Sequence, residues 1–129
     1  MLQAIAGAMS PRRTWVVPSP ADVIFGITLA VAAVVRGWIA INTDGDLPRH
    51  LRVGSEILSH GLFFTDKFSW TMQGQPFVPY EWGSEVLYTM AHRAAGLPGV
   101  ILLMGVALAA AYALLYLLMV KLGMDPLLA

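Results

Sequence analysis

Two long apolar runs dominate the pattern of hydrophobic and polar positions. Residues 100–120 contain no charged side chain, and residues 23–35 are apolar apart from Thr28, with the run continuing past Arg36 to residue 41. A helix rises ~1.5 Å per residue, so each run is long enough to cross the ~30 Å hydrocarbon core of a bilayer. The pattern therefore predicts two transmembrane helices, at 21–41 and 100–120.

Arg36 interrupts the first of these runs near its end. A long cationic side chain close to a helix end can reach the lipid–water interface, and Trp38 fits the aromatic belt at the same depth. The other interpretation is that the guanidinium pairs with a phosphate or a carboxylate. The sequence leaves both open.

Composition supports a membrane protein. The chain is 57% hydrophobic and 12% charged, with a mean hydropathy of +0.67, and 129 residues enclose too little interior to hide that much apolar surface. The net charge of +0 gives no basic field for nucleic acid. With Cys 0, disulfide scaffolds and thiolate metal sites are excluded.

The charges near the two runs favour one topology. Arg12 and Arg13 precede the first span and Lys121 follows the second, so we place both termini in the cytoplasm. The predicted layout is a cytoplasmic tail at 1–20, a span at 21–41, an extracytoplasmic loop at 42–99, a span at 100–120 and a tail at 121–129.

The first part of the loop predicts a helix over 47–60. Asp46 suits the N-cap, Pro48 the first turn and Gly61 the stop position. At ~100° per residue one arc is apolar, and the other, which includes Arg49 and Arg52, is polar. This pattern is typical of an amphipathic helix on a membrane surface or against neighbouring spans. His50 lies in the middle of the apolar arc, either as a structural histidine or as part of a site.

A second helix is predicted over 80–95, ended by Gly96 and Pro98. Between the two helices, Pro76, Pro79 and the turn at Gln73-Gly74 favour an ordered extended segment or a small hairpin. The predicted fold is thus an all-α membrane protein, with two transmembrane helices joined by a loop that carries two amphipathic juxtamembrane helices.

The second helix carries a polar stripe. Glu81, Glu85, Tyr88 and His92 follow one another at i, i+4, i+7 and i+11 and so lie on one side. Two carboxylates, a phenol and an imidazole can bind a divalent ion or a sugar, or transfer protons. An ordinary solvated face explains the same spacing.

Asp44-Gly45-Asp46 follows directly after the first span. Two carboxylates one residue apart at a membrane surface can bind a metal ion or act as a general base on an acceptor hydroxyl. Alternatively, Asp46 caps the helix and Asp44 occupies a turn made by Gly45.

The loop as a whole resembles the first extracytoplasmic loop of bacterial GT-C-type membrane glycosyltransferases, the relatives of protein mannosyltransferases and lipid A aminoarabinose transferases. The resemblance covers residues 44–100. The positions that carry it are Asp44-x-Asp46, His50, Gly54, Ile57, Gly61, Asp66-x-Phe68-Ser69-x-Thr71, Gly74-x-Pro76 and Glu81-Trp82-x-x-Glu85.

The resemblance implies a sugar donor on a polyprenyl phosphate and a bacterial inner-membrane location. It implies Asp44 and Asp46 as catalytic residues and as ligands of a divalent metal ion. Substrate-binding or supporting roles would fall to His50, Arg52, Glu81 and Glu85. The chain departs from the family pattern at Tyr80, where a histidine is expected, and at Gly83, where a bulky apolar residue is expected.

Three functional classes follow. The first is an N-terminal fragment of such an enzyme, inactive alone because further transmembrane helices of a parent or partner must enclose the donor. The second is a small two-span membrane protein whose amphipathic loop binds a partner without catalysis. The third is a transporter-like fragment in which Glu81, Glu85 and His92 transfer protons.

Overall fold

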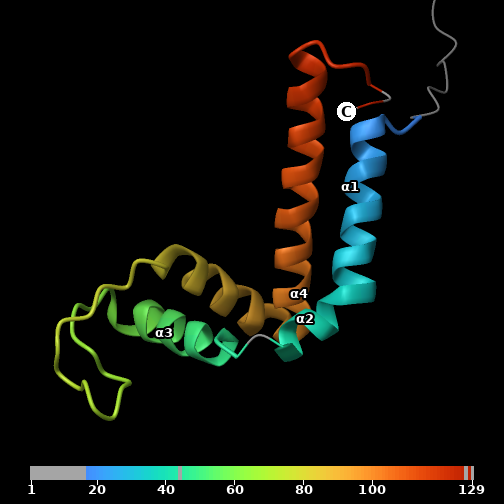
Figure 1. Cartoon of the computed structure of the whole chain (residues 1–129). Helices are drawn as coiled ribbons and strands as arrows, with labels where there is room; N and C mark the ends of the chain where they lie inside the picture. The colour runs from blue at the N-terminus through green and yellow to red at the C-terminus, as the bar shows by residue number, and fades with distance from the viewer. Residues whose placement is uncertain (1–16, 44, 127, 129) are drawn as a thin grey trace, which may run out of the picture.

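The computed structural model describes residues 17–43, 45–126 and 128. The regular elements in these residues are helices, and Figure 1 shows them in an L-shaped arrangement. One arm holds two long helices side by side, and the other is a helical hairpin that extends sideways from their end. In chain order the elements are α1 (Pro20–Ala30), η1 (Val31–Arg36), α2 (Gly37–Thr43), α3 (Leu47–His60) and α4 (Trp82–Lys121).

The first long helix begins at a well-formed cap. The Ser19 hydroxyl accepts a hydrogen bond from the Asp22 backbone N–H at 3.3 Å, and the Asp22 carboxylate accepts one from the Ser19 backbone N–H at 2.8 Å. With Pro20 in the first turn, these reciprocal bonds satisfy donors that have no partner within the helix. The helix therefore starts at Pro20.

The first long helix is continuous through a π-helical segment. Together α1, η1 and α2 form a rod of 24 residues, Pro20–Thr43, about 36 Å long at ~1.5 Å per residue. It contains the predicted span 21–41 and extends two residues past it. The sequence pattern gave no sign of the π turn at Val31–Arg36.

α4 is two helical segments joined by a sharp bend. Ala95 (φ −145°, ψ 19°) and Gly96 (φ 64°, ψ −154°) have non-helical backbone, and Pro98 follows in the first turn of the second segment. A positive φ is adopted readily by glycine, and proline cannot extend a helix that precedes it. The break lies where Gly96 and Pro98 predict it, while the first segment starts at Trp82 instead of residue 80.

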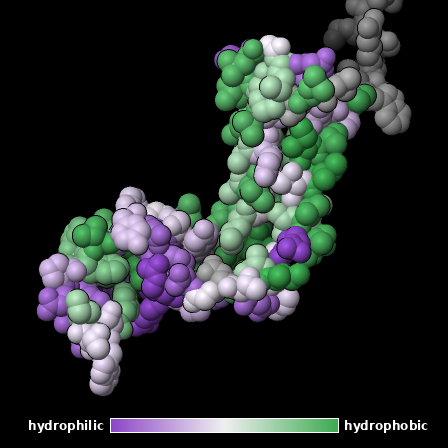
Figure 2. All heavy atoms as spheres, in the orientation of Figure 1, coloured by the Kyte–Doolittle hydropathy of each residue, from purple (hydrophilic) through white to green (hydrophobic). Residues whose placement is uncertain are grey.

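Both long helices are apolar and mostly unburied. In the most apolar 18-residue stretch of each helix, only 11% is buried for Pro20–Thr43 and 28% for Trp82–Lys121. The core helix of a soluble protein would be mostly buried. Figure 2 shows hydrophobic residues covering this arm and hydrophilic residues gathered on the hairpin. By length and composition, both helices are able to cross a membrane.

The long helices touch through small residues. A Cβ on Gly105 would lie 3.2 Å from a methyl of Leu29 and 3.3 Å from the Cβ of Ala33, and one on Gly37 would lie only 2.3 Å from a methyl of Ile101. Ala109, four residues after Gly105 on the same helix, is fully buried. Small residues that permit close backbone approach are the usual contact between helices in lipid.

α3 packs against the first segment of α4 through another glycine. A Cβ on Gly54 would lie 2.1 Å from the Glu85 carbonyl oxygen and 2.3 Å from the Thr89 hydroxyl, so only glycine permits this approach. Val53 beside it is 1% exposed. A hydrogen bond also joins the two helices, because the Thr89 hydroxyl donates to the Leu51 carbonyl at 3.2 Å.

α3 begins and ends at the residues that its sequence predicts. Gly61 follows its last residue with φ 82°, and its N–H donates to the Ile57 carbonyl at 2.9 Å. Asp46 stands at the N-cap, but its side chain makes no capping hydrogen bond, and the carbonyl instead accepts from the His50 N–H. The element therefore has the bounds expected for 47–60, without the expected side-chain cap.

The segment between α3 and α4 forms a small hairpin-like loop. Thr65 and Pro76 form an isolated antiparallel bridge, and Gly74 (φ 81°) makes the turn. The buried ring of Phe63 stacks on Phe77 at 5.5 Å between centroids and meets Phe68 edge-on at 5.6 Å. The loop thus has its own aromatic core.

Candidate functional site

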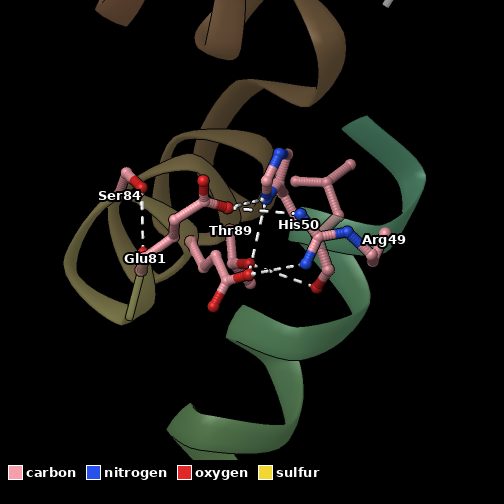
Figure 3. Close-up of polar contacts among 7 residues, drawn as sticks. Arg49, His50, Glu81, Ser84 and Thr89 are labelled. Carbon is pink, nitrogen blue, oxygen red and sulfur yellow. Dashed lines mark hydrogen bonds and ion pairs between the residues drawn. The ribbon is translucent and has the colours of Figure 1, made fainter. Parts of the chain in front are cut away.

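A polar cluster lies between α3 and the start of α4 (Figure 3). Arg49 and His50 come from α3, and Glu81 and Glu85 from the N-terminal end of α4. His50 Nδ1 lies 3.4 Å from Glu85 Oε1 and 3.5 Å from Glu81 Oε2. The Arg49 guanidinium donates to Glu81 Oε2 at 3.2 Å and lies 3.6 Å from Glu85 Oε1. Two carboxylates thus share one guanidinium and one imidazole.

Burial in the cluster is uneven. Glu85 is 1% exposed and the His50 side chain 15% exposed, whereas the side chains of Arg49 and Glu81 are 44% and 39% exposed. Glu85 is buried because Gly54 brings α3 onto its backbone. The interpretation of the stripe as a solvated face is therefore wrong for Glu85.

One oxygen of Glu85 lacks a partner. Oε2 is buried and has no hydrogen bond, while Oε1 faces Arg49 and His50. A small cavity of about 50 Å³ adjoins the carboxylate and is lined by Arg49, Glu81, Glu85 and residues 77–80. A cavity of that size has room for a water molecule or an ion.

The other stripe residues do not join the carboxylates directly. The Tyr88 ring meets the His50 ring edge-on, with 6.2 Å between centroids, and His92 is exposed. His50 is thus held between the carboxylates and Tyr88. The helical spacing placed Glu81, Glu85 and Tyr88 near one another, and the surroundings of α3 decided which of them became buried.

Among the predicted site residues, the cluster includes His50, Glu81 and Glu85. Arg52 lies elsewhere, with its guanidinium carbon 5.9 Å from the centre of the Phe68 ring. Arg49, which sequence reasoning assigned only to the polar arc, takes the cationic position in the cluster. The signal that was missed is its adjacency to His50, because neighbouring residues at the edge of a buried face can both reach one partner helix.

The acidic pair contributes less to the described site. Asp44 lies outside the described residues, so its expected catalytic and metal roles rest on the sequence. Asp46 is exposed at the start of α3. In the part of the chain that the structure describes, the side chains suitably placed for a metal ion are His50, Glu81 and Glu85, and Asp46 is not among them.

A groove runs between the long helices and reaches the hairpin. Its volume is about 520 Å³, and its lining is apolar apart from a few groups that include Arg36 and Tyr88. Met104 and Leu108 on its wall are exposed. Arg36 is itself exposed, and no carboxylate among residues 17–43, 45–126 and 128 pairs with it. The groove therefore joins an apolar surface, one guanidinium and, through Tyr88, the polar cluster.

Two acids of α3 and the loop that follows it have altered titration. The hydrogen bond from Lys67, at 2.8 Å, holds the pKa of Glu56 below its ordinary value of 4.5. Hydrogen bonds from Ser69, and also from the Phe68 N–H, lower the pKa of Asp66 from its ordinary 3.8. Both acids organise the loop that connects α3 to α4.

The chain matches no protein-family model, no curated protein and no solved structure.

Proposed function

We propose that this chain is the donor-binding segment of a membrane glycosyltransferase of GT-C type, which transfers a sugar from a polyprenyl phosphate to an acceptor hydroxyl. The observation that carries the proposal is the groove between the long helices, with Arg36 on its wall and Tyr88 at its hairpin end. The resemblance of residues 44–100 to the family agrees with it. In this proposal the chain lies in a bacterial inner membrane, with residues 42–99 on the extracytoplasmic side.

The groove has the chemistry that a lipid-phosphate sugar requires. An apolar chain fits a surface made largely of alanine, glycine and aliphatic side chains. The Arg36 guanidinium offers paired N–H donors to phosphate oxygens, and near the end of a span its long side chain would be able to reach a lipid headgroup. This gives Arg36 the role of phosphate partner, the second of the two interpretations that its sequence context left open.

In the sequence, the acidic pair follows the span that carries Arg36. Arg36 comes about two helical turns before Thr43, the last residue of α2, and Asp44 follows. In the proposed reaction Asp44 or Asp46 takes the proton of the acceptor hydroxyl while that oxygen attacks the anomeric carbon. The bond from this carbon to the lipid phosphate breaks, and Arg36 stabilises the departing phosphate.

Transfer needs a closed site, and the groove is open along Met104 and Leu108. Water must be excluded around the donor for such electrostatic stabilisation to be effective. Further transmembrane helices, of the same protein or of a partner, would have to cover the groove. We therefore expect donor binding by this chain alone, without turnover.

Binding of a photoactivatable polyprenyl-phosphate sugar to the chain in nanodiscs tests the proposal. We expect saturable crosslinking to groove residues, competed by polyprenyl phosphate but not by the neutral polyprenol. Arg36→Gln should weaken binding roughly ten-fold, the cost of one charge-assisted hydrogen bond of ~1.5 kcal/mol. Arg93→Gln, which removes an arginine that does not line the groove and that bonds Ser55 instead, is the matched control.

Equal competition by polyprenol, or an unchanged affinity of Arg36→Gln, would contradict the proposal. The catalytic step has its own test in an active full-length protein, where Asp44→Asn and Asp46→Asn should abolish transfer while donor crosslinking persists. Unaffected transfer in both variants would remove the acidic pair from the mechanism.

A non-catalytic, partner-binding function is the second candidate, and the loop favours it. Trp70 is 99% exposed and Tyr80 80% exposed, on a loop that is otherwise ordered around Phe63. Large aromatic side chains are frequent anchors in protein interfaces. If Trp70→Ala abolishes capture of a specific membrane partner while the lipid probe never binds, this second function is the better one.

A further inference from the structure

Glu85 is a buried acid whose carboxylate is only half satisfied. It is 1% exposed, and its Oε2 atom has no hydrogen-bond partner. Buried polar atoms without partners are rare in folded proteins because each one carries its full desolvation penalty. A group in this state indicates a missing partner beside it.

The surrounding charges also leave room for a cation. Glu81 and Glu85 bring two negative charges, and Arg49 is the cation that contacts them both. Arg49 approaches Glu85 only to 3.6 Å, and its side chain is 44% exposed. Two carboxylates that share one guanidinium can accept a further cation, because an uncompensated charge is costly at a buried position.

The ligand atoms are spaced as a metal ion needs them. Zinc binds histidine nitrogen and carboxylate oxygen at ~2.1 Å in a tetrahedron, which places neighbouring ligand atoms ~3.4 Å apart. His50 Nδ1 lies 3.4 Å from Glu85 Oε1 and 3.5 Å from Glu81 Oε2. All three atoms lie within 4.8 Å of one another. Two edges of the tetrahedron are therefore already formed, one of them at Glu85 Oε1, and a carboxylate that binds the ion through both oxygens would also give the unpaired Oε2 a partner.

We propose that His50, Glu81 and Glu85 form a divalent-cation site of the zinc type that joins α3 to α4. One imidazole and two carboxylates suit zinc better than magnesium or calcium, which prefer ligand sets made of oxygen alone. Three protein ligands leave a fourth position for water, and the cavity of about 50 Å³ beside Glu81 and Glu85 has room for it. The site stands without the proposed sugar transfer, because it uses neither Arg36 nor the groove.

Arg49 gives this proposal a distinctive consequence. Its guanidinium occupies the Glu81 oxygen that a metal ion would bind, so the two cations compete for the same carboxylates. Removing the guanidinium should leave metal affinity unchanged or raise it. If the cluster is only a set of ion pairs, removing the same group should instead simply weaken the hairpin.

Metal titration of the full chain is the test. The protein is purified without a histidine tag, stripped with chelator in detergent, and titrated with ZnCl₂ against a fluorescent zinc chelator. We expect one zinc ion per chain and a higher melting temperature with zinc. His50→Gln and Glu85→Gln should each lose at least ~100-fold in affinity, more than the ~10–100-fold typical of residues that only orient a ligand. Glu81→Gln, which is partly exposed, should lose less.

Two matched controls lie on the same helices. His92→Gln removes an exposed imidazole of α4, and Glu56→Gln removes an acid of α3 that pairs with Lys67 and His60. Neither change should alter zinc affinity. Helical circular dichroism of every variant without metal checks that it folds, and if Glu85→Gln does not fold, the comparison of His50→Gln with His92→Gln decides.

Absence of stoichiometric zinc binding would overturn the proposal. So would equal losses in His50→Gln and His92→Gln, which would indicate adventitious binding to surface histidines. Loss of binding in Arg49→Gln with the fold intact would show that the guanidinium supports the cluster and does not compete with a metal ion. A ten-fold or greater preference for magnesium over zinc would contradict the assigned ligand chemistry.

Discussion

Both arms of the molecule have a glycine at a helix crossing, but the two crossings enclose different kinds of side chain. In the long arm, Gly105 brings the second long helix onto Leu29 and Ala33, and the contact is apolar. In the hairpin, Gly54 brings α3 onto the backbone of Glu85, and the contact encloses charge. Close approach of two helices therefore does not by itself determine the chemistry of the contact. That chemistry depends on the side chains that surround the glycine.

The difference follows from the surroundings of each arm if the long helices cross a membrane, as their length and composition allow. Between helices in lipid there is no hydrophobic driving force, so close packing of small residues holds them together. The hairpin lies outside the apolar arm, as Figure 2 shows, and its surface is largely hydrophilic. If water surrounds the hairpin, burial of apolar groups also helps to hold α3 and α4 together. There a buried carboxylate is tolerated because Arg49 and His50 lie beside it. The hairpin is thus the arm suited to chemistry, and the long arm the one suited to lipid.

The largest loss of stability is expected from a substitution of Gly54 in the hairpin. Gly54→Ala places a methyl 2.1 Å from the Glu85 carbonyl, a backbone atom that cannot turn aside. We expect a loss of about 3 kcal/mol, at the upper end of the usual range for overpacking, and separation of α3 from α4. Hydrogen exchange of α3 amides in detergent measures this.

Gly83→Ala is the control, because a Cβ there meets nothing within 4 Å. It should be neutral or slightly stabilising, since alanine favours a helix over glycine by ~1 kcal/mol. Similar exchange in both variants would mean that the Gly54 contact does not hold the hairpin together.

The contact between the long helices should respond less to substitution. Gly105→Leu adds a side chain where a Cβ already lies 3.2 Å from a Leu29 methyl and 3.3 Å from the Ala33 Cβ, and the nearer of these is the end of a flexible side chain. We expect the helices to shift apart at a cost of about 1–2 kcal/mol while each stays helical. Spin labels on cysteines introduced at Ile27 and Leu114 measure the separation, since the chain has Cys 0.

Gly26→Leu, in open space on the same arm, is the matched control. An unchanged label distance in Gly105→Leu would show that the long helices are held by something other than this crossing.

The smallest expected effect is a pH response of the connecting loop. The pKa values of Glu56 and Asp66 are lowered in the folded chain, so their stabilisation is complete above their ordinary values of 4.5 and 3.8. It is lost as the pH falls through the lower folded values. The Phe68 and Ser69 amides, which donate to Asp66, should therefore exchange faster at pH 3 than at pH 6, after correction for intrinsic rates.

Asp66→Asn should flatten this response, because an amide does not titrate in the range. If the two amides in that variant keep the full pH response, the carboxylate of Asp66 is not its origin.

Several elements could be predicted from the residues along the chain because their causes are local. Pro48 and Gly61 mark the two ends of α3, and Gly96 with Pro98 marks the bend in α4. The turn at Gln73-Gly74 appears where proposed, with Gly74 at positive φ. Each of these features depends on backbone conformations that glycine and proline favour or forbid over a few residues.

The candidate site could be predicted only in part. Helical spacing placed Glu81 and Glu85 on one side of their helix, but Glu81 stands just before α4 and stays half exposed while Glu85 is buried. Periodicity assigned Arg49 to a polar arc and gave no reason to prefer it over Arg52. The choice depends on where α3 crosses α4, which is a long-range contact.

The sequence by itself determined that two apolar stretches form helices long enough to cross a membrane, and where the hairpin helices end. Length, hydropathy and the preferences of glycine and proline are properties of short segments, and they are unaffected by neighbours distant in the chain. Only the tertiary structure decided that Glu85 is buried with one oxygen unpaired, and that Arg49 and His50 face it. Burial depends on what lies opposite a side chain, and at Glu85 the opposing surface is supplied by Gly54, thirty-one positions earlier in the chain.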